Sequence, residues 1–282
     1  MSDCLVLQRS GDMAWLTLNR PELKNAISYE MWLEIPDLVD QVERDSALKV
    51  LILRGAYGGV FSAGADITEF RELRSTADGA RRYNKATEQA RTSLAELTKP
   101  SIAMVNGLCM GGGCELALAC DLRFADTEAR FSLTPAKLGL VYGLGATKDL
   151  VDLVGPSQAK YILYSGRNVS AERARSIGLA DEVLEPDELE SYTVDFAIEV
   201  AARAQFSVRS TKRIVTLIRN GLSEDCEESW DCGSTHLKLQ TFVRGFCPSS
   251  RSARRGSTIA DYTRCRFSTP ENLSLKPVPP GA

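Results

Sequence analysis

Histidine is almost absent from this sequence: His236 is the only one among 282 residues. Chemistry that depends on a histidine base, or on several histidine ligands to a metal, is therefore not expected. The eight cysteines include no CxxC pair, and several stand inside apolar runs. This pattern favours buried, reduced thiols over disulfides. We expect a cytoplasmic protein without a metal site.

Long apolar runs and strong net charge are also missing. No segment approaches the roughly 20 apolar residues of a membrane-spanning helix, and the first residues do not show the pattern of a secretory signal. The net charge of −3 gives no reason to expect nucleic acid or an anionic membrane as a partner. Arginines are frequent in residues 69–97, but acidic residues are interleaved with them, which is typical of a solvated face of mixed charge.

The pattern of apolar residues predicts an α/β fold. Residues 5–18 are typical of two strands around a Gly-Asp turn, and the apolar runs 49–56 and 100–108 are typical of strands buried on both faces. A glycine- and alanine-rich loop is expected at 58–67, followed by a long polar helix over 69–97. Strands that alternate with helices indicate a sheet with right-handed crossovers.

Capping residues predict where several helices begin and end. Ser28 is expected to cap a helix that Pro36 interrupts or breaks. After about Pro135 the pattern becomes helical, with Ser170 as an N-cap and Gly178 as a C-cap.

Three regions are predicted along the chain. Residues 1–200 form the α/β core, and residues 201–225 begin a C-terminal helical region. Residues 226–282 form an atypical tail that is rich in Ser, Arg, Thr and Pro, lacks sustained periodicity and is expected to be partly disordered.

The segment VNGLCMGGGCELALACD, residues 105–121, places three glycines directly before an apolar helix that holds one acid, Glu115. Glycines at a strand–helix junction let backbone N–H groups approach a ligand closely. The first amides of a helix lack internal partners and favour negative charge. A helix that starts near Gly112 would place Glu115 on the face of these amides, as a base beside an oxyanion hole. From spacing alone, a tight packing junction with a capping acid remains the alternative.

A second loop, GGVFSAGADI, lies about 40 residues before the glycine segment. Together the two loops resemble the paired signatures of the enoyl-CoA hydratase/isomerase (crotonase) superfamily. The resemblance extends in order from about residue 5 to residue 220, through LNRPELKNAIS, TKPSIAMVNG, LVGPSQAKYILYSGR and SAERARSIGLADEV. It implies a crotonase-like (ClpP/crotonase) spiral of ββα units with a C-terminal helical trimerisation region. It also implies a homotrimer or dimer of trimers that acts on acyl-CoA thioesters with no cofactor besides the coenzyme A of the substrate.

The resemblance also assigns roles to residues. The N–H groups of Ala65 and Gly112 would form the oxyanion hole, and Glu115 would be the acid/base. A thioester forms an enolate during reaction, and each fixed donor to the enolate oxygen is typically worth roughly 3 kcal/mol. Two segments would hold the coenzyme, and their residues are Lys24 and Ala26 in the first and Ala63, Ala65, Asp66 and Ile67 in the second. Without the family context, the second segment would be only a tight loop.

One family feature is missing. Hydratases of the family carry a second glutamate, whose position holds Pro135 here, and no acid follows nearby. Water addition ordinarily uses one group to activate water and another to manage the α-carbon proton. We therefore rank a lyase or isomerase with one glutamate ahead of a 2-enoyl-CoA hydratase. A noncatalytic acyl-CoA-binding protein is the third alternative.

The segment TPAKLGLVYGLGAT resembles the branch that includes methylmalonyl-CoA decarboxylase. In that reading Tyr142 donates a hydrogen bond to a carboxylate or an enolate. An ordinary pocket aromatic is the alternative for Tyr142. The match is incomplete, because the decarboxylase has a histidine at the position of Ala65.

The C-terminal part departs from the family, whose members end in a helix that closes the site. Read in a shifted frame, the codons that could encode QTFVRGFCPSSRS yield a sequence like that helix. We therefore hypothesise a frameshift between about Asp225 and Gly233.

Overall fold

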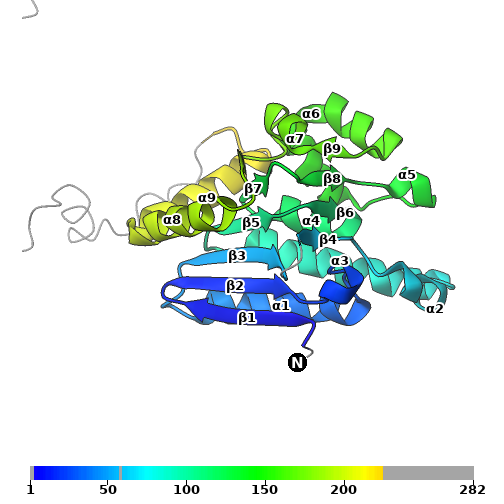
Figure 1. The fold of residues 1–282 in the computed structure, drawn as a ribbon, viewed down its shortest axis with the longest axis horizontal. Helices are drawn as coiled ribbons and strands as arrows, with labels where there is room; N and C mark the ends of the chain where they lie inside the picture. Colours follow the sequence, from blue (N-terminus) through cyan, green and yellow to red (C-terminus); the bar gives the residue numbers. More distant parts are fainter. Residues whose placement is uncertain (1–2, 57–58, 225–282) are drawn as a thin grey trace, which may run out of the picture. The chain divides into compact units, whose positions relative to one another are not determined.

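Two sheets of different size organise the part of the chain that the computed structural model describes, residues 3–56 and 59–224 (Figure 1). The larger sheet contains, in spatial order, β1 (Leu5–Ser10), β2 (Met13–Leu18), β3 (Val50–Gly55), β5 (Ser101–Val105), β7 (Leu122–Asp126) and β10 (Glu182–Leu184). The smaller sheet contains β4 (Val60–Ser62), β6 (Leu108–Met110), β8 (Arg130–Ser132) and β9 (Val169–Ser170).

The helices lie between and after these strands. They are α1 (Tyr29–Arg44), α2 (Phe70–Leu73), α3 (Ala77–Glu96), α4 (Gly111–Ala119), α5 (Pro135–Leu138), α6 (Leu144–Ser165), α7 (Ala171–Ser176), α8 (Leu189–Ala202) and α9 (Gln205–Arg219). Two short 3₁₀ helices are also described, η1 (Pro21–Leu23) and η2 (Ile67–Glu69). None of the described helices is long and apolar enough to cross a membrane.

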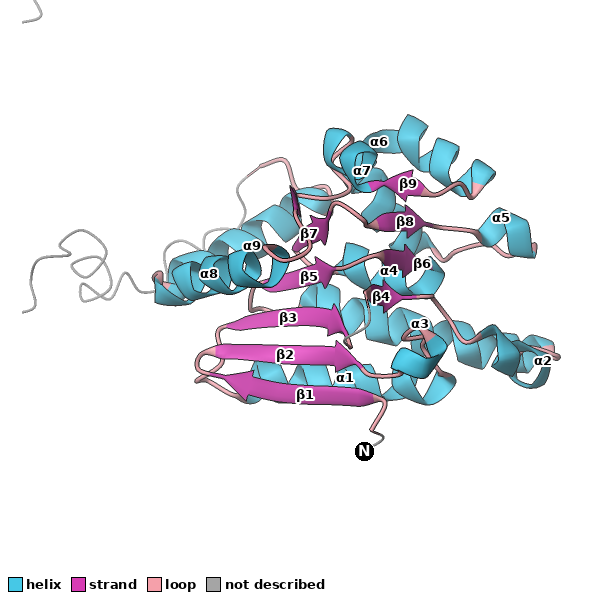
Figure 2. Ribbon diagram, in the orientation of Figure 1, coloured by secondary structure: helices cyan, strands magenta, loops and turns pink. Residues whose placement is uncertain are grey.

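The chain forms a spiral of ββα units. Each successive pair of strands, β3/β4, β5/β6 and β7/β8, sends one strand to each sheet and is followed by helices (Figure 2). The strands of successive units are parallel within both sheets. Parallel neighbours require crossover connections, which the helices provide. The predicted crotonase-like spiral is therefore confirmed.

The larger sheet separates two apolar cores because side chains alternate along its strands. In β3, Leu51 and Leu53 join the core formed with α1, α3 and α4. Val50 and Ile52 join the opposite core, which α8 completes with Leu189, Ala197 and Ala201. The near-continuous apolar sequence of β3 follows from this burial on both faces.

Two sequence-based expectations about helices were wrong. Pro36 does not break its helix, and α1 runs through it from Tyr29 to Arg44. The face of α1 that contains Trp32, Ile35 and Val39 is buried on both sides of the proline, and this burial outweighs the missing backbone hydrogen bond. The expected helix over 69–97 is divided into α2 and α3, because Thr76 caps a new helix through a hydrogen bond from the Gly79 N–H.

Other local expectations agree with the structure. The Ser28 and Ser170 side chains cap α1 and α7 by accepting from the N–H groups of Met31 and Arg173. Gly178 follows α7 with a φ of +79°, although the C-cap itself is Ile177. The loop expected at 58–67 contains the short strand β4.

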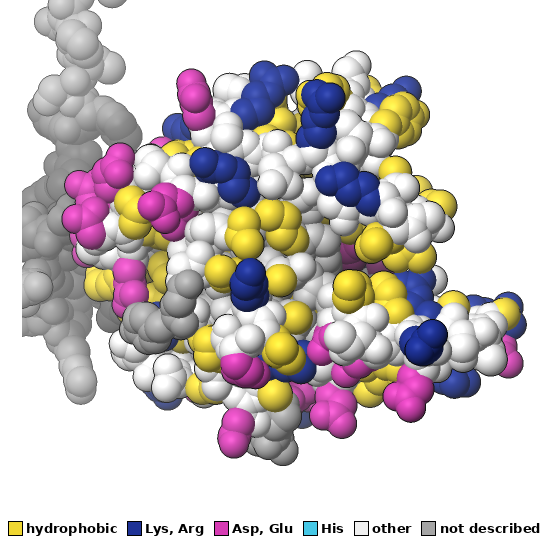
Figure 3. Space-filling model, turned by 45° about the vertical axis from the view of Figure 1, so that its right-hand side comes forward, with side chains coloured by type: hydrophobic (Ala, Val, Ile, Leu, Met, Phe, Trp, Pro, Cys, Tyr) yellow, Lys and Arg dark blue, Asp and Glu magenta, His cyan; other side chains and the backbone are white. Residues whose placement is uncertain are grey.

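The three cysteines nearest the glycine triplet, Cys109, Cys114 and Cys120, are buried in the main core. The boundaries predicted at residues 200 and 225 stay predictions, and α8 runs across the first of them. The predicted tail, the frameshift segment and His236 lie outside the described residues. On the face in Figure 3, charged side chains of both signs are interspersed with hydrophobic ones.

Candidate active site

The first amide of the site belongs to the segment that follows β4. Ile27 pairs with this segment in a parallel bridge: its N–H donates to the Gly64 carbonyl, and its carbonyl accepts from the Asp66 N–H, at 2.8 and 2.9 Å. In a parallel bridge of this kind, the hydrogen bonds are made by the residues on either side of Ala65, Gly64 and Asp66. The N–H of Ala65 itself points away from Ile27. Within the described residues the Ala65 N–H donates to no acceptor. It is available to a ligand.

The second amide lies in the first turn of α4. The helix begins at Gly111 after Met110, and no side chain caps it. Its first N–H groups therefore keep their hydrogen-bonding capacity, and the helix dipole places partial positive charge there. A Cβ atom on Gly112 would lie 2.7 Å from the Trp32 ring and 3.5 Å from the Ala65 nitrogen. Glycine is therefore required for this start of α4 to pack beside Ala65.

The glycine triplet also brings the two segments together at a neighbouring point. Gly64 has a φ of +99°, a conformation that side chains disfavour, and a Cβ there would lie 2.9 Å from the Met110 carbonyl oxygen. A Cβ on Gly113 would lie 2.5 Å from the Ser62 side chain. These close backbone approaches make the Ala65 and Gly112 amides neighbours.

Glu115 lies on the next part of α4 and faces a cavity of about 630 Å³. Ala65, Gly112 and Tyr142 line the same cavity, so the structure brings the four predicted catalytic residues together. Burial raises the pKa of Glu115 to about 7, and the negative charge of Glu88 adds to this effect. No hydrogen bond from another described group opposes the rise. A carboxyl group with this pKa can accept and donate protons near neutral pH.

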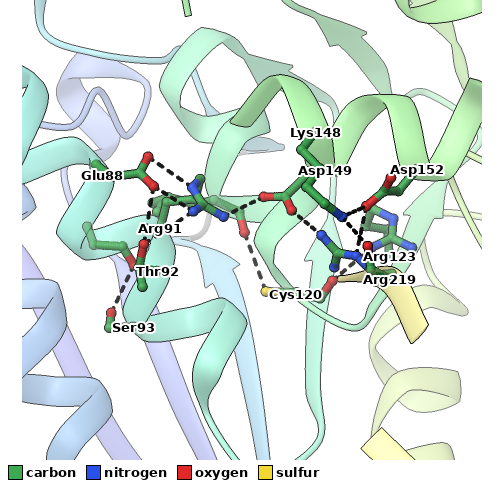
Figure 4. Close-up of polar contacts among 12 residues, drawn as sticks. Glu88, Arg91, Thr92, Ser93, Cys120, Arg123, Lys148, Asp149, Asp152 and Arg219 are labelled. Atoms are coloured by element: carbon green, nitrogen blue, oxygen red, sulfur yellow. Dashed lines mark hydrogen bonds and ion pairs between the residues drawn. The ribbon is translucent and has the colours of Figure 1, made fainter. Parts of the chain in front are cut away.

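Glu88 in α3 is a second carboxylate on the wall of this cavity. Nη2 and Nε of Arg91 donate to its Oε1 and Oε2 at 2.6 and 3.1 Å, and these hydrogen bonds hold the pKa of Glu88 below its usual range. Arg91 also donates to Asp149 at 2.7 Å, and Asp149 in turn accepts from Arg219 of α9 (Figure 4). The mixed charges of residues 69–97 had suggested that Glu88 lies on a solvated face, so its place on the cavity wall was missed.

Gly145 at the start of α6 leaves room for the Glu88–Arg91 pair. A Cβ at this position would lie 2.7 Å from Oε1 of Glu88. Pro135, where the resemblance predicted the missing second glutamate, also lines the cavity, and the carboxylate of Glu88 reaches the cavity from a different element, α3. Only a three-dimensional arrangement could show this, because α3 and α4 meet through tertiary packing.

Tyr142 is half-buried at the cavity, and its hydroxyl oxygen lies 3.7 Å from the position of a Cβ on Gly111. Burial and the charge of Glu115 raise the pKa of Tyr142 well above its usual range. The hydroxyl therefore stays protonated and can donate a hydrogen bond beside the start of α4.

The predicted coenzyme-binding residues divide into two groups. Ala63, Ala65 and Ile67 line the cavity, whereas Lys24, Ala26 and Asp66 do not. The Lys24 carbonyl accepts from the Ala63 N–H at 2.9 Å, and the Ala26 carbonyl accepts from Arg20.

Asp66 is buried and forms an ion pair of 3.0 Å with Arg20. Its side chain also accepts from Thr68, and these contacts lower the pKa of Asp66. They hold the backbone of the loop that carries the Ala65 amide. Among the described residues, no group of three or more His, Cys, Asp or Glu side chains is placed to hold a metal ion.

Comparison with known proteins gives a consistent result. The family model described as enoyl-CoA hydratase/isomerase matches residues 8–225. The chain is 35% identical over 236 residues to the short-chain-enoyl-CoA hydratase of Clostridium acetobutylicum, covering 82% of this chain and 90% of that protein. It is 33% identical over 254 residues to the crotonyl-CoA hydratase of Syntrophomonas wolfei, covering 90% of this chain and 93% of that protein.

A solved structure is also similar. The crystal structure of an enoyl-CoA hydratase/isomerase family protein from Hyphomonas neptunium matches with a TM-score of 0.78 and 37% sequence identity, covering 86% of this chain and 90% of that one.

Proposed function

The chain belongs to the enoyl-CoA hydratase/isomerase family, and from this premise we propose that it adds water to 2-enoyl-CoA thioesters. The observation that carries the proposal is the presence of the Ala65 and Gly112 amides and of Glu115, with its raised pKa, around one cavity. The names of the two hydratase relatives support hydration over the lyase or isomerase reaction that the sequence favoured.

The reaction follows from the roles of three groups. The thioester oxygen accepts hydrogen bonds from the Ala65 and Gly112 N–H groups, which withdraws electrons from C3 of the acyl chain. The ionised Glu115 removes a proton from water as the water oxygen attacks C3, and the electron pair of the C2=C3 bond becomes a thioester enolate. Glu115 then transfers this proton to C2, and the enolate returns to the thioester. One water molecule is added, and Glu115 ends ionised.

Glu88 supplies the second carboxylate that Pro135 does not provide. Because Arg91 keeps the pKa of Glu88 low, this side chain is an ionised hydrogen-bond acceptor at neutral pH. In this proposal the carboxylate of Glu88 accepts a hydrogen bond from the second hydrogen of the attacking water. That hydrogen bond orients the water while Glu115 transfers the first proton. The nearness of the two carboxylates is supported by the effect of Glu88 on the pKa of Glu115, the largest after burial.

A second candidate reaction rests on Tyr142. Its protonated hydroxyl beside Gly111 can donate to a carboxylate at C2 of an acyl-CoA or to the enolate oxygen. Loss of carbon dioxide from methylmalonyl-CoA would leave the electron pair of the broken C–C bond in a thioester enolate, that of propionyl-CoA, held by the same two amides. Glu115 would then protonate the carbon.

Oligomeric state belongs to the proposal as well. We propose a homotrimer or a dimer of trimers that uses the helical region after residue 200. Support comes from α9, of which no residue is buried in the single chain, and from its exposed apolar side chains Phe206, Val215 and Ile218. Light scattering coupled to gel filtration measures the mass. A monomer at micromolar concentration would refute this part of the proposal.

The function is tested by turnover of three thioesters in deuterated water, followed by mass spectrometry. The substrates are crotonyl-CoA, a 3-enoyl-CoA and methylmalonyl-CoA, and the proteins are wild type and Glu115→Gln. We expect gain of water by crotonyl-CoA with wild type alone. Loss of carbon dioxide from methylmalonyl-CoA without hydration of crotonyl-CoA would replace hydration with the second candidate. Binding of all three without any turnover would identify a noncatalytic acyl-CoA-binding protein.

A further inference from the structure

Arg74 is a cation on the wall of the active-site cavity. It follows α2 and is half-buried, and its guanidinium carbon lies 5.0 Å from the centre of the Phe70 ring and 5.2 Å from that of Tyr83. Nη2 donates to the Asn84 side-chain oxygen at 3.2 Å. Two aromatic rings and one amide therefore hold the guanidinium in place.

Within the part of the chain that the structure describes, no carboxylate contacts the guanidinium of Arg74. Among residues 3–56 and 59–224, Arg74 forms no ion pair, and its one side-chain hydrogen bond uses only one of the five N–H donors of a guanidinium. Arg91, by comparison, contacts both Glu88 and Asp149. A partly desolvated arginine with free planar donors is suited to bind a carboxylate in two-point fashion.

A chain of contacts links Arg74 to the amides that are proposed to hold the thioester. Tyr83, over which Arg74 lies, accepts a hydrogen bond of 3.1 Å from Nε1 of Trp32, and the Trp32 ring packs on Gly112 of the oxyanion hole. The positive charge of Arg74 also acts on Glu115, the proposed acid/base. These contacts connect Arg74 with the wall around the reacting carbons.

We propose that Arg74, with the side-chain amide of Asn84, binds a second carboxylate on the acyl chain. The preferred substrates are then mono-CoA thioesters of unsaturated dicarboxylic acids. The carboxylate site is argued from contacts alone, whereas the statement that these thioesters are hydrated rests on the proposed hydratase function. Glu88 and Glu115 are the acidic side chains on the described cavity wall. Arg91 neutralises Glu88, and Glu115 serves the reacting end of the acyl chain, so neither excludes a distal carboxylate at Arg74.

The test compares two substrates of equal length, trans-2-hexenedioyl-CoA and trans-2-hexenoyl-CoA, which differ in the distal carboxylate. We expect wild type to prefer the dicarboxylic thioester in kcat/KM. Arg74→Gln should lower kcat/KM for this substrate by about 10- to 100-fold more than for the uncharged substrate, the usual range for loss of a charge-assisted pair. Arg74→Lys should keep part of the preference.

Arg71→Gln is the matched control, because Arg71 lies in α2, just before Arg74, is exposed and does not line the cavity. This variant should keep the wild-type preference. Thermal unfolding of each variant checks the fold. The inference is refuted if wild type hydrates hexenoyl-CoA without preferring the dicarboxylic thioester, or if Arg74→Gln lowers kcat/KM equally for both.

A binding measurement separates this inference from the proposed function. Saturated adipyl-CoA and hexanoyl-CoA are titrated into wild type and Arg74→Gln. If no substrate is hydrated but adipyl-CoA binds more tightly in an Arg74-dependent manner, the hydratase proposal fails and the carboxylate site stands. Equal affinities of the two thioesters in wild type would contradict the site whatever the reaction.

Discussion

Replacing Glu115 by glutamine should make the protein more stable at alkaline pH. The pKa of Glu115 is about 7 in the folded chain and near its ordinary 4.5 when unfolded, chiefly because burial disfavours the charged form. The folded state therefore holds the proton more tightly than the unfolded state. Ionisation costs no stability below pH 4.5, a growing amount between pH 4.5 and 7, and its full amount above pH 7.

The size of the effect follows from the same two values. Each unit of difference in pKa between the folded and unfolded states corresponds to about 1.4 kcal/mol of stability. The full cost of ionising Glu115 in the folded state is therefore about 3 kcal/mol. Because the cavity admits solvent to Glu115, we expect on the order of 2 kcal/mol in the free energy of unfolding. Glutamine has the shape of the protonated acid. The variant should thus match wild type at pH 4.5 and exceed it at pH 8.

Urea denaturation at several pH values and equal protein concentration measures this difference. Glu88→Gln is the control, because its effect has the opposite sign. The pKa of Glu88 is lowered in the folded state, so its stabilisation is present at neutral pH and is lost in acid. A Glu115→Gln difference that does not change with pH, or a variant less stable than wild type at pH 8, would refute the reasoning.

The catalytic site and its polar network allow three more predictions. Hydration should decline as pH falls through about 7, because Glu115 must be ionised to accept the water proton; kcat/KM, which reports the free enzyme, tests this from pH 5 to 9, and a flat profile contradicts it. Gly112→Ala should lower kcat at least about 100-fold, since its Cβ would meet the Trp32 ring and displace an oxyanion donor; steady-state kinetics at unchanged secondary structure would show it. Asp149→Asn should destabilise the fold by about 2 kcal/mol, because the buried Asp149 side chain loses its charged hydrogen bonds from Arg91 and Arg219 while Arg91 keeps only Glu88; urea denaturation measures it.

Local signals predicted much of the fold. Alternating apolar residues identified the strands of residues 5–18, and Ser28 identified the start of α1 correctly. The break expected at Pro36 was wrong because a proline's effect depends on what the rest of the helix buries, and that is decided by tertiary packing. The division of 69–97 into α2 and α3 could have been expected from Thr76, a good N-cap residue.

Without the family resemblance, which supplied Ala65 and Tyr142, the site was predictable only where its residues are close in sequence. Gly112 and Glu115 share one helix turn, so their common face followed from helix geometry. Glu88 and Arg74 carry charges that look like ordinary surface charges in a polar helix. Their place on the cavity wall depends on how α3 packs against α4 and α2 against α3, which no local pattern contains.

Proton transfer by Glu115 is the central step of the proposed water addition. The most direct measurement follows crotonyl-CoA in ¹⁸O-labelled water, with wild type and Glu115→Gln, alongside calorimetric binding of butyryl-CoA. We predict the label at C3 of the wild-type product, at least about 100-fold slower incorporation by the variant, and unchanged binding. Incorporation by Glu115→Gln at the wild-type rate, or no incorporation by wild type that binds butyryl-CoA, would contradict the claim.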